Sequence, residues 1–325
     1  MDRVKQKNVV FWTENIPYAQ NADNSNMFSQ EFWEKADKER YRNETNFSEL
    51  FAEILQPSLV SLEVGCGSGN DLRTFARHGL RVTGLDYSPE NAYLSNVGLK
   101  ACKLNGRVVS GDAECLPFPD ESFDLVYSWG VLHHTPKTQQ CVDELYRVLR
   151  PGGKAVVMLY HKGYQYWYFL SSYIFLLKFT KQKLQDYISY GYDYAPLSQM
   201  FSRKELHSLF KKFTNVGVRV IAYPNTRYHP ILKYIWKIFQ ISPWLTQRFG
   251  SFGVIIAHKP GQSDSIAEAP FPCCPLCHTE LDYLVNEVKC KNSSCGASFP
   301  VHKGEMSMLH PNAQQVYKSF LDKNK

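Results

Sequence analysis

Three glycines at alternate positions, flanked by two acidic residues, are the part of this 325-residue chain best suited to chemistry. Glu63 stands two residues before Gly65, the glycines continue at Gly67 and Gly69, and Asp86 follows seventeen residues after the last glycine. Glycines let a backbone turn tightly and approach a ligand closely. An acid at the end of the next strand can accept hydrogen bonds from two ribose hydroxyls. The spacing predicts a site for an adenosine-containing cofactor.

The glycine spacing also bears on which cofactor binds. A dinucleotide site uses G-x-G-x-x-G to bring a helix N-terminus against a pyrophosphate, whereas this chain has G-x-G-x-G. With Glu63 before the loop, the arrangement suits a cofactor that has a cationic amino-acid end and no phosphate. On this motif alone, S-adenosylmethionine is modestly favoured over a nicotinamide dinucleotide.

Strands and helices on either side of the loop must hold it in place. Short β-branched or apolar runs bounded by turn residues predict strands at 59–64, 81–86, 107–111, 123–129, 154–160, 216–222 and 252–258. Helical patterns predict helices at 28–56, 70–78, 89–99, 138–149, 164–190 and 203–213, with a turn at 150–153. We therefore expect a doubly wound, mostly parallel, seven-stranded α/β sheet with ligands at the carboxyl ends of its strands.

Later segments carry a resemblance to a known family. After the glycine loop and Asp86 come GDAECLPFPDESFDLVYSWGVLHHTP and LYRVLRPGGKAVVMLY, in this order. Over about residues 28–160 the chain strongly resembles the class I S-adenosylmethionine-dependent methyltransferases, which have a Rossmann-like fold. The segments 9–33 and 194–210 are similar to a bacterial branch of that family, whose members act mostly on small molecules or are uncharacterised.

The resemblance implies a set of residues that bind S-adenosylmethionine. Glu63 would lie near the methionine amino group, and the three glycines would form the loop under the methionine and ribose. The remaining contacts would come from the ends of the following strands: Asp86 at the ribose, Tyr87, Asp112 and Ala113 at the adenine, and Ser128 and Trp129 beside the sulfonium. Tyr18, in the N-terminal segment, could close over the cofactor, or it could simply pack.

Methyl transfer from a sulfonium is an in-line displacement, in which alignment of the nucleophile supplies much of the catalysis. A hydroxyl or phenol acceptor also needs a base, whereas an amine only has to be neutral. The candidate side chains at the strand ends are His133, His134, Tyr160 and His161. Each histidine can be interpreted as a general base or as a polar wall of the pocket, and the second interpretation is favoured.

Five of the nine cysteines lie between positions 273 and 295. They include two short-spaced pairs separated by twelve residues. The pairs are Cys274 with Cys277 and Cys290 with Cys295, and Cys273 is an alternative to Cys274. Two such pairs predict a tetrahedral zinc site, which is structural because four thiolates leave no open position.

The cysteine segment resembles a second family. Together with SFPVHKGEMSML at 298–309, it is similar to the small zinc-ribbon activator subunit that partners tRNA, rRNA and protein methyltransferases. Lys303 and Met306 depart from that family's pattern, which leaves open whether the partner-binding role is the same.

Charge is unevenly distributed along the chain, whose formal net charge is +6. Residues 162–259 contain 14 Lys and Arg against 3 Asp and Glu, and 23 of the 46 aromatic residues. This block predicts either a solvated basic face over an aromatic core or contact with an anionic or membrane-surface partner. Its insertions 164–213 and 224–250 are expected to define an acceptor that is aromatic, lipophilic or anionic. They could instead rest on a membrane, with Lys178, Lys181 and Lys183 near the headgroups.

The sequence as a whole favours a cytoplasmic enzyme, because no signal segment is visible and the apolar run 164–177 is too short to span a bilayer. We expect a methyltransferase domain at 1–259, a linker at 260–272 and a zinc ribbon at 273–325. The expected reaction is methyl transfer to a small-molecule, biosynthetic acceptor. The alternatives are a tRNA or rRNA methyltransferase with the ribbon as its activator in cis, and a scaffold that binds the cofactor without catalysis. The sequence leaves the oligomeric state open.

Overall fold

The computed structural model describes residues 3–14, 26, 28–42, 47–176, 195–222, 242–262, 268–302 and 305–309. Several sequence expectations lie outside these residues. They are Tyr18, the lysines at 178, 181, 183 and 303, the end of the helix expected at 164–190, and most of the insertion 224–250.

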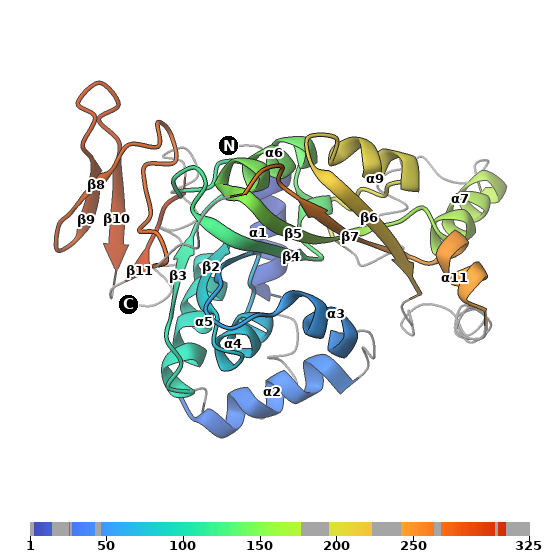
Figure 1. Cartoon of the computed structure of the whole chain (residues 1–325), viewed down its shortest axis with the longest axis horizontal. Coiled ribbons are helices and arrows are strands. Elements are labelled where there is room, and N and C mark those ends of the chain that lie inside the picture. Colours follow the sequence, from blue (N-terminus) through green and yellow to red (C-terminus); the bar gives the residue numbers. More distant parts are fainter. Residues whose placement is uncertain are drawn as a thin grey trace.

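A seven-stranded sheet forms the centre of the fold (Figure 1). Its strands are β1 (Val60–Val64), β2 (Arg81–Asp86), β3 (Gly106–Ser110), β4 (Phe123–Trp129), β5 (Leu149–Tyr160), β6 (Thr214–Ile221) and β7 (Phe252–His258). They lie in the order β3-β2-β1-β4-β5-β7-β6. Strands β1 to β5 are parallel, and β7 runs antiparallel to both of its neighbours. The predicted mostly parallel, doubly wound sheet is therefore confirmed.

Helices connect and cover the strands. They are α1 (Arg3–Glu14), α2 (Gln30–Arg42), α3 (Phe47–Ile54), α4 (Asn70–Arg77), α5 (Pro89–Ala101), α6 (Thr138–Val148), α7 (Tyr164–Leu176), α9 (Arg203–Leu209) and α11 (Pro243–Phe249), with a short 3-10 turn at Leu132–His134. Within the described residues, none of these helices combines the length and apolar character needed to cross a membrane.

The two faces of the sheet carry different helices because side chains alternate along each strand. Val126 and Val157 face one way and belong to a buried cluster with Leu145 of α6 and Leu206 of α9. Their neighbours in the strands, such as Tyr127, face the other way, into a cluster that includes residues of α3 and α4. Figure 1 shows α6 and α9 on one side of the sheet and α3, α4 and α5 on the other.

The structure departs from the sequence expectations at three elements. The helix α1 was not predicted, and the helix expected at 28–56 is divided into α2 and α3. The turn expected at 150–153 lies inside β5, which begins at Leu149 rather than at 154. The strand accommodates the turn as a local irregularity, because Gly152 has a φ of 79° and its N–H donates to the Lys259 carbonyl at 3.0 Å.

A second, four-stranded antiparallel sheet lies beside the edge strand β3 (Figure 1). It consists of β8 (Leu281–Tyr283), β9 (Glu287–Cys290), β10 (Ser298–His302) and β11 (Glu305–Met306). Ser307 pairs with Ser110 in parallel, and the Met308 N–H donates to the Ser110 carbonyl at 2.8 Å. Unpaired edge strands invite aggregation. The C-terminal sheet covers the exposed edge of β3.

Candidate active site

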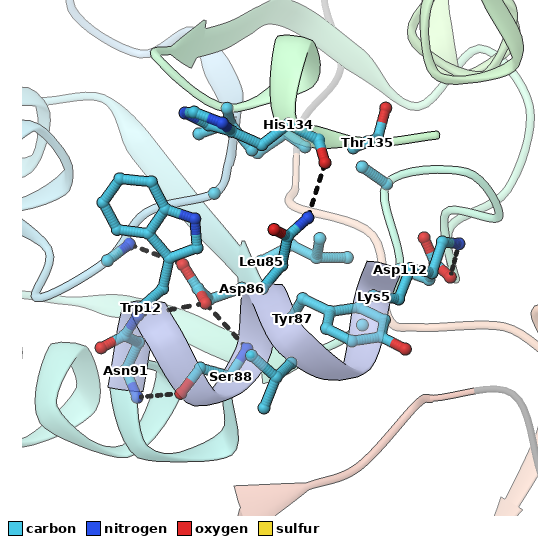
Figure 2. Close-up of a pocket in the computed structure, with 18 of the residues that line it drawn as sticks. Lys5, Trp12, Leu85, Asp86, Tyr87, Ser88, Asn91, Asp112, His134 and Thr135 are labelled. Atoms are coloured by element: carbon cyan, nitrogen blue, oxygen red, sulfur yellow. Dashed lines mark hydrogen bonds and ion pairs between the residues drawn. The ribbon is translucent and has the colours of Figure 1, made fainter. Parts of the chain in front are cut away.

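The main candidate site is a pocket at the carboxyl ends of β1, β2 and β4, closed on one side by α1 (Figure 2). The following predicted cofactor residues line it: Gly65, Gly67, Asp86, Tyr87, Asp112, Ala113 and Trp129. Three other predicted residues support the pocket without lining it: Glu63, Gly69 and Ser128. Ser128 is buried, and its hydroxyl donates to the Val64 carbonyl at 2.9 Å, which joins β4 to β1.

The glycine loop is shaped by positive φ angles that side chains rarely adopt. Gly65, Gly67 and Gly69 have φ values of 77°, 54° and 80°. A Cβ at Gly65 would collide with Val131, whereas a Cβ at Gly67 would meet no protein atom within 4 Å. Because Gly67 lines the pocket, that open space belongs to the pocket, and the loop leaves room there for a ligand against the bare backbone.

Asp86 fixes the loop and faces the same pocket. Its Oδ2 accepts the Gly67 N–H at 2.8 Å, and its Oδ1 accepts the Ser88 N–H at 2.9 Å. Burial raises the pKa of Asp86, although these two N–H groups act in the opposite direction. The Asn91 side-chain amide also donates to Oδ1, at 3.4 Å, so Oδ2 is the oxygen with a second lone pair for a hydroxyl group of a ligand.

Glu63 is buried at the end of β1, and its Oε2 has no hydrogen-bond partner within the described part of the chain. Burial, and then the neighbouring charge of Asp71, raises the pKa of Glu63 well above its usual value. A buried carboxylate without a partner is costly, so this position is suited to receive a cation.

Helix α1 supplies pocket residues that the sequence analysis missed. The Lys5 ammonium donates to Asp112 and to Glu114, both at 2.6 Å, and these two carboxylates raise the pKa of Lys5 against the opposing effect of burial. The Asn8 side chain donates to the His134 carbonyl at 2.6 Å, and the Trp12 ring packs against the His134 ring at 5.1 Å. Of these residues, Trp12 lies in the segment 9–33 that carries the family resemblance, whereas Lys5 and Asn8 lie before it and had no sequence signal.

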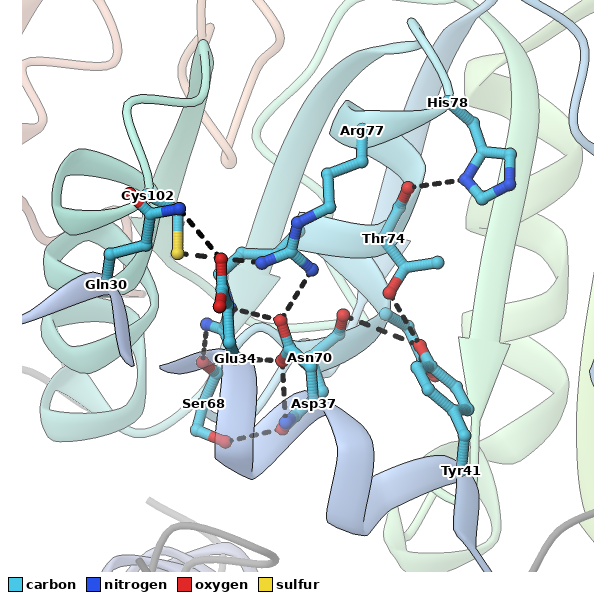
Figure 3. Close-up of polar contacts among 12 residues, drawn as sticks. Gln30, Glu34, Asp37, Tyr41, Ser68, Asn70, Thr74, Arg77, His78 and Cys102 are labelled. Atoms are coloured by element: carbon cyan, nitrogen blue, oxygen red, sulfur yellow. Dashed lines mark hydrogen bonds and ion pairs between the residues drawn. The ribbon is translucent and has the colours of Figure 1, made fainter. Parts of the chain in front are cut away.

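A buried ionic network beneath the loop holds α2 against α4 (Figure 3). Asp37 accepts hydrogen bonds from Arg73 at 2.6 Å, from Arg77 at 2.7 Å and from Asn70 at 3.0 Å. Arg73 has no exposed surface, and it also donates to the Ser68 carbonyl of the loop at 2.6 Å. The network therefore fixes the side of the glycine loop that faces away from the pocket.

Three of the four predicted catalytic residues form one cluster of rings. His133 stacks on Tyr160 with 3.7 Å between ring centroids, and the His134 ring lies 4.1 Å from that of His133. His133 is fully buried, neither ring nitrogen has a hydrogen-bond partner among the described residues, and burial lowers its pKa well below the usual value. His161 lies outside this cluster. Its Nδ1 is 2.8 Å from the Gly250 carbonyl.

Of these residues, His134 lines the pocket. Its Nδ1 lies 2.6 Å from the Leu197 carbonyl, and a carbonyl can only accept a hydrogen bond. Nδ1 therefore carries the proton, and Nε2 is the nitrogen with the lone pair when the ring is neutral.

The four predicted metal ligands come together in the C-terminal sheet. The sulfur atoms of Cys274, Cys277, Cys290 and Cys295 all lie within 4.8 Å of one another. The Cys274 and Cys295 sulfurs are 3.8 Å apart, and those of Cys277 and Cys290 are 3.4 Å apart. Four thiolates at a Zn–S distance of about 2.3 Å in a tetrahedron would be separated by about 3.8 Å. The donor set therefore fits a tetrahedral zinc ion.

Cys273 does not belong to this group. Its side chain is buried, and its N–H donates to the Pro117 carbonyl at 2.9 Å. A hydrogen bond with the Thr279 side chain lowers the pKa of Cys277 to about 6, whereas burial raises the pKa of Cys274 and of Cys290.

The cysteine cluster is in direct contact with the turn that carries Asp112. The Cys115 thiol donates to the carbonyl of Pro275, which lies between two of the cluster's cysteines. On the neighbouring strand, Arg107 donates to the Pro270 carbonyl at 3.0 Å, and its guanidinium lies 4.0 Å from the centroid of the Phe271 ring.

Comparisons with known proteins match the part of the chain that builds the pocket. Residues 62–157 match the family model described as "Methyltransferase domain". The chain is 31% identical over 105 residues to a sterol 4-C-methyltransferase of Caenorhabditis elegans, and the matched region covers 32% of this chain and 31% of that protein. It is 39% identical over 100 positions to a demethylmenaquinone methyltransferase of Tropheryma whipplei, with 30% and 39% covered. A cycloartenol-C-24-methyltransferase of Arabidopsis thaliana is 36% identical over 131 positions, with 38% of each chain covered.

The chain thus spans about a third of the length of these curated relatives. A phosphoethanolamine N-methyltransferase of Haemonchus contortus has a TM-score of 0.48 at 18% identity, with 66% of this chain and 52% of that chain covered. That likeness is too weak to add to the sheet order described above. The segment that supplies most of the pocket therefore matches a methyltransferase domain in sequence. In the structure this segment contains β2 to β4 and most of β1 and β5 of the seven-stranded sheet.

Proposed function

We propose that this chain transfers the methyl group of S-adenosylmethionine to a small lipophilic acceptor. The observation that carries the proposal is Glu63, a buried acid whose Oε2 has no partner among the described residues. It lies at the end of β1, next to the strand that ends in Asp86. A cofactor with a ribose at one point and an ammonium group at another would satisfy both acids, whereas a dinucleotide has no ammonium group for Glu63.

The residues present fit this cofactor along the whole pocket. Glu63 does not line the pocket itself, but it directly precedes Val64 and Gly65, which do, and it would pair with the amino group of the cofactor. The open space at Gly67 would let the cofactor lie against the backbone of the loop. Asp86 would accept its ribose hydroxyls, while Tyr87 and Asp112 would bound its adenine. When bound, S-adenosylmethionine supplies an electrophilic methyl group on a sulfonium.

Aromatic side chains favour a lipophilic acceptor. Trp129 lines the pocket, and it belongs with Tyr160, Tyr166 and the buried Phe169 to one apolar cluster that joins the strand ends to α7. The relatives with similar sequences are named for sterol and demethylmenaquinone substrates, and a further one, from Mycobacterium tuberculosis, for phthiotriol dimycocerosates. We infer an acceptor of the same broad class, a small molecule with a large apolar part.

The three rings of the cluster, those of His133, His134 and Tyr160, are proposed to have different roles. His134 lines the pocket with its proton held on Nδ1, and its Nε2 is buried, so we interpret this ring as a polar wall of the pocket. His133 is kept neutral by burial and stacks behind Tyr160, which makes it a positioning residue. His161 anchors the chain near Gly250 and is not proposed to contact the acceptor.

The C-terminal cysteines are proposed to hold a structural zinc ion. Four thiolates satisfy tetrahedral zinc and leave no position for a substrate. We keep the division into a methyltransferase domain at 1–259, a linker at 260–272 and a zinc-ribbon domain at 273–325 as part of this proposal.

Methyl-labelled S-adenosylmethionine tests the proposed function. The purified chain is incubated with the labelled cofactor and, separately, with a lipid extract or with total tRNA and rRNA. We expect label in the lipid fraction, and none with an Asp86→Asn variant. Label in the RNA fraction would contradict a small-molecule acceptor and would support the tRNA or rRNA alternative. Binding of S-adenosylhomocysteine without transfer to either fraction would support a cofactor-binding scaffold.

A further inference from the structure

Helix α7 presents an apolar stripe to solvent. The helix begins four residues after the end of β5 and has no charged residue along Tyr164–Leu176. Tyr164 and Phe169 are buried against the fold, whereas Trp167 is 54%, Ile174 58% and Phe175 83% exposed. The three exposed residues are spaced so that they share one face of the helix.

Helix α11 packs against α7 and presents a similar side chain. Tyr164 and Tyr168 of α7 form a small apolar cluster with Leu245 and Phe249 of α11. On the outside of α11, Trp244 is 69% exposed. Figure 1 shows the two helices side by side at the end of the molecule opposite the C-terminal sheet. Single exposed apolar residues are ordinary, but four large ones on two adjoining helices indicate an interaction surface.

The charge around this surface is positive. The described residues between 162 and 259 include eight Lys and Arg and one acid, Glu205, and four of the eight cations form ion pairs, namely Lys162, Lys212, Arg219 and Lys259. Arg248 is exposed one turn after Trp244 on α11, and Lys204 is exposed at the start of α9. Helix α9 lies near α11, because the Arg203 side chain donates to the Gln247 side chain at 2.9 Å. Neither Arg248 nor Lys204 forms an ion pair with any residue that the structure describes.

We propose that α7 and α11 dock on the surface of a bilayer that contains anionic lipids. Tryptophan and phenylalanine partition into the interface between headgroups and acyl chains, and nearby cations are attracted to anionic headgroups. A second copy of the chain fits the surface less well, because two basic surfaces of the same kind would repel each other. RNA fits less well because Ile174 offers no ring for stacking.

Docking would also serve the site proposed above. Helix α7 begins four residues after Tyr160, at the same edge of the sheet as the cofactor pocket, and both contribute to the apolar cluster with Trp129, so docking through α7 would bring a lipophilic acceptor toward the pocket. This last step rests on the proposed function, whereas the docking itself does not depend on methyl transfer.

Vesicle sedimentation tests the docking. The full chain is mixed with vesicles of phosphatidylcholine alone or of phosphatidylcholine with phosphatidylglycerol. We expect binding to the anionic vesicles that weakens as salt is added. The triple variant Trp167→Ser, Phe175→Ser and Trp244→Ser should bind at least about tenfold more weakly, and Arg248→Gln about fivefold more weakly.

The matched control is the double variant Leu284→Ser and Val285→Ser. It removes side chains that are 49% and 90% exposed in the turn between β8 and β9, at the far end of the molecule, and it should bind vesicles as the unchanged chain does. Thermal unfolding and S-adenosylhomocysteine affinity confirm that each variant is folded.

Equal vesicle binding by the triple variant and the unchanged chain would overturn the proposal, as would no binding to anionic vesicles. Self-association or RNA binding that is lost in the triple variant, without any vesicle binding, would assign the surface to that partner instead. The proposed methyl transfer would be unaffected, because cofactor affinity and transfer in detergent are measured separately.

Discussion

Replacing Glu63 by Gln changes the charge of the proposed ammonium site with little change in its shape. Glu63 is buried, so a hydrogen bond from a ligand ammonium group would be charge-assisted and shielded from water. Such a bond contributes about 1.5–3 kcal/mol. At about 1.4 kcal/mol for each factor of ten, the Glu63→Gln variant should bind S-adenosylhomocysteine roughly 10- to 150-fold more weakly. Isothermal titration calorimetry measures this difference.

A second ligand makes the prediction specific. Methylthioadenosine has the adenine, ribose and sulfur of the cofactor but no amino-acid end, so its affinity should be the same for Glu63→Gln and for the unchanged chain. The Asp86→Asn variant should instead bind both ligands more weakly, because both have a ribose. Glu49→Gln, an exposed change on α3, serves as the control and should bind neither more weakly.

The pH dependence supplies a further check. Burial raises the pKa of Glu63 well above the usual value, so without ligand the carboxyl is more protonated than an exposed glutamic acid at the same pH. Pairing with an ammonium group lowers that pKa again, so binding releases a proton. The affinity for S-adenosylhomocysteine should therefore rise with pH until Glu63 is ionised in the free protein, and then level off. The reasoning is refuted if Glu63→Gln weakens both ligands equally, or if it leaves the pH dependence unchanged.

Three other changes test the loop, the network beneath it and the cysteine cluster. Asp37→Asn should lower the free energy of unfolding in urea by about 3–5 kcal/mol, because it leaves the fully buried Arg73 without its carboxylate; a loss below about 1 kcal/mol would contradict this. Gly67→Ala should weaken the binding of S-adenosylhomocysteine at least about tenfold, since the methyl group of the alanine would enter the pocket. The positive φ at this position should lower the free energy of unfolding by only about 1–2 kcal/mol. An unchanged affinity would show that the ligand lies elsewhere. Cys290→Ser should abolish bound zinc and speed hydrogen exchange in β8 to β10 and at Ser110, and retained zinc would exclude Cys290 as a ligand.

The central sheet could be predicted because its strands are short apolar runs separated by clear turn signals. Strand β4, for instance, is buried along nearly its whole length and reads as FDLVYSW between two turns. The glycine loop could be predicted for a related reason, because alternate glycines with positive φ have few other uses. In both cases the information lies within a few neighbouring residues.

Helix α1 could not be predicted in this way. It has no acidic residue in its first turn and no basic residue in its last, and Val9 is its one buried side chain. Its position depends instead on partners far away in the sequence, such as Asp112 for Lys5 and the His134 carbonyl for Asn8. Local propensity is weak for such a segment, and tertiary contacts decide its structure.

The turn that follows β3 depends on both ends of the chain. Asp112 and Glu114 are close enough to share one ammonium group, so without Lys5 of α1 their like charges would repel each other in a partly buried place. On its other side the turn is held by the C-terminal segment, through the Cys115 thiol, which donates to the Pro275 carbonyl, and through the Met308 N–H, which donates to the Ser110 carbonyl.

The predicted adenine end of the pocket is therefore built from three regions that are distant in sequence, namely α1, the turn after β3 and the cysteine cluster. Each contact that joins them spans more than 100 residues, as between Lys5 and Asp112 or between Cys115 and Pro275. A motif search finds the acids of this turn but not the groups that keep them in place. The C-terminal sheet consequently belongs to the architecture of the pocket.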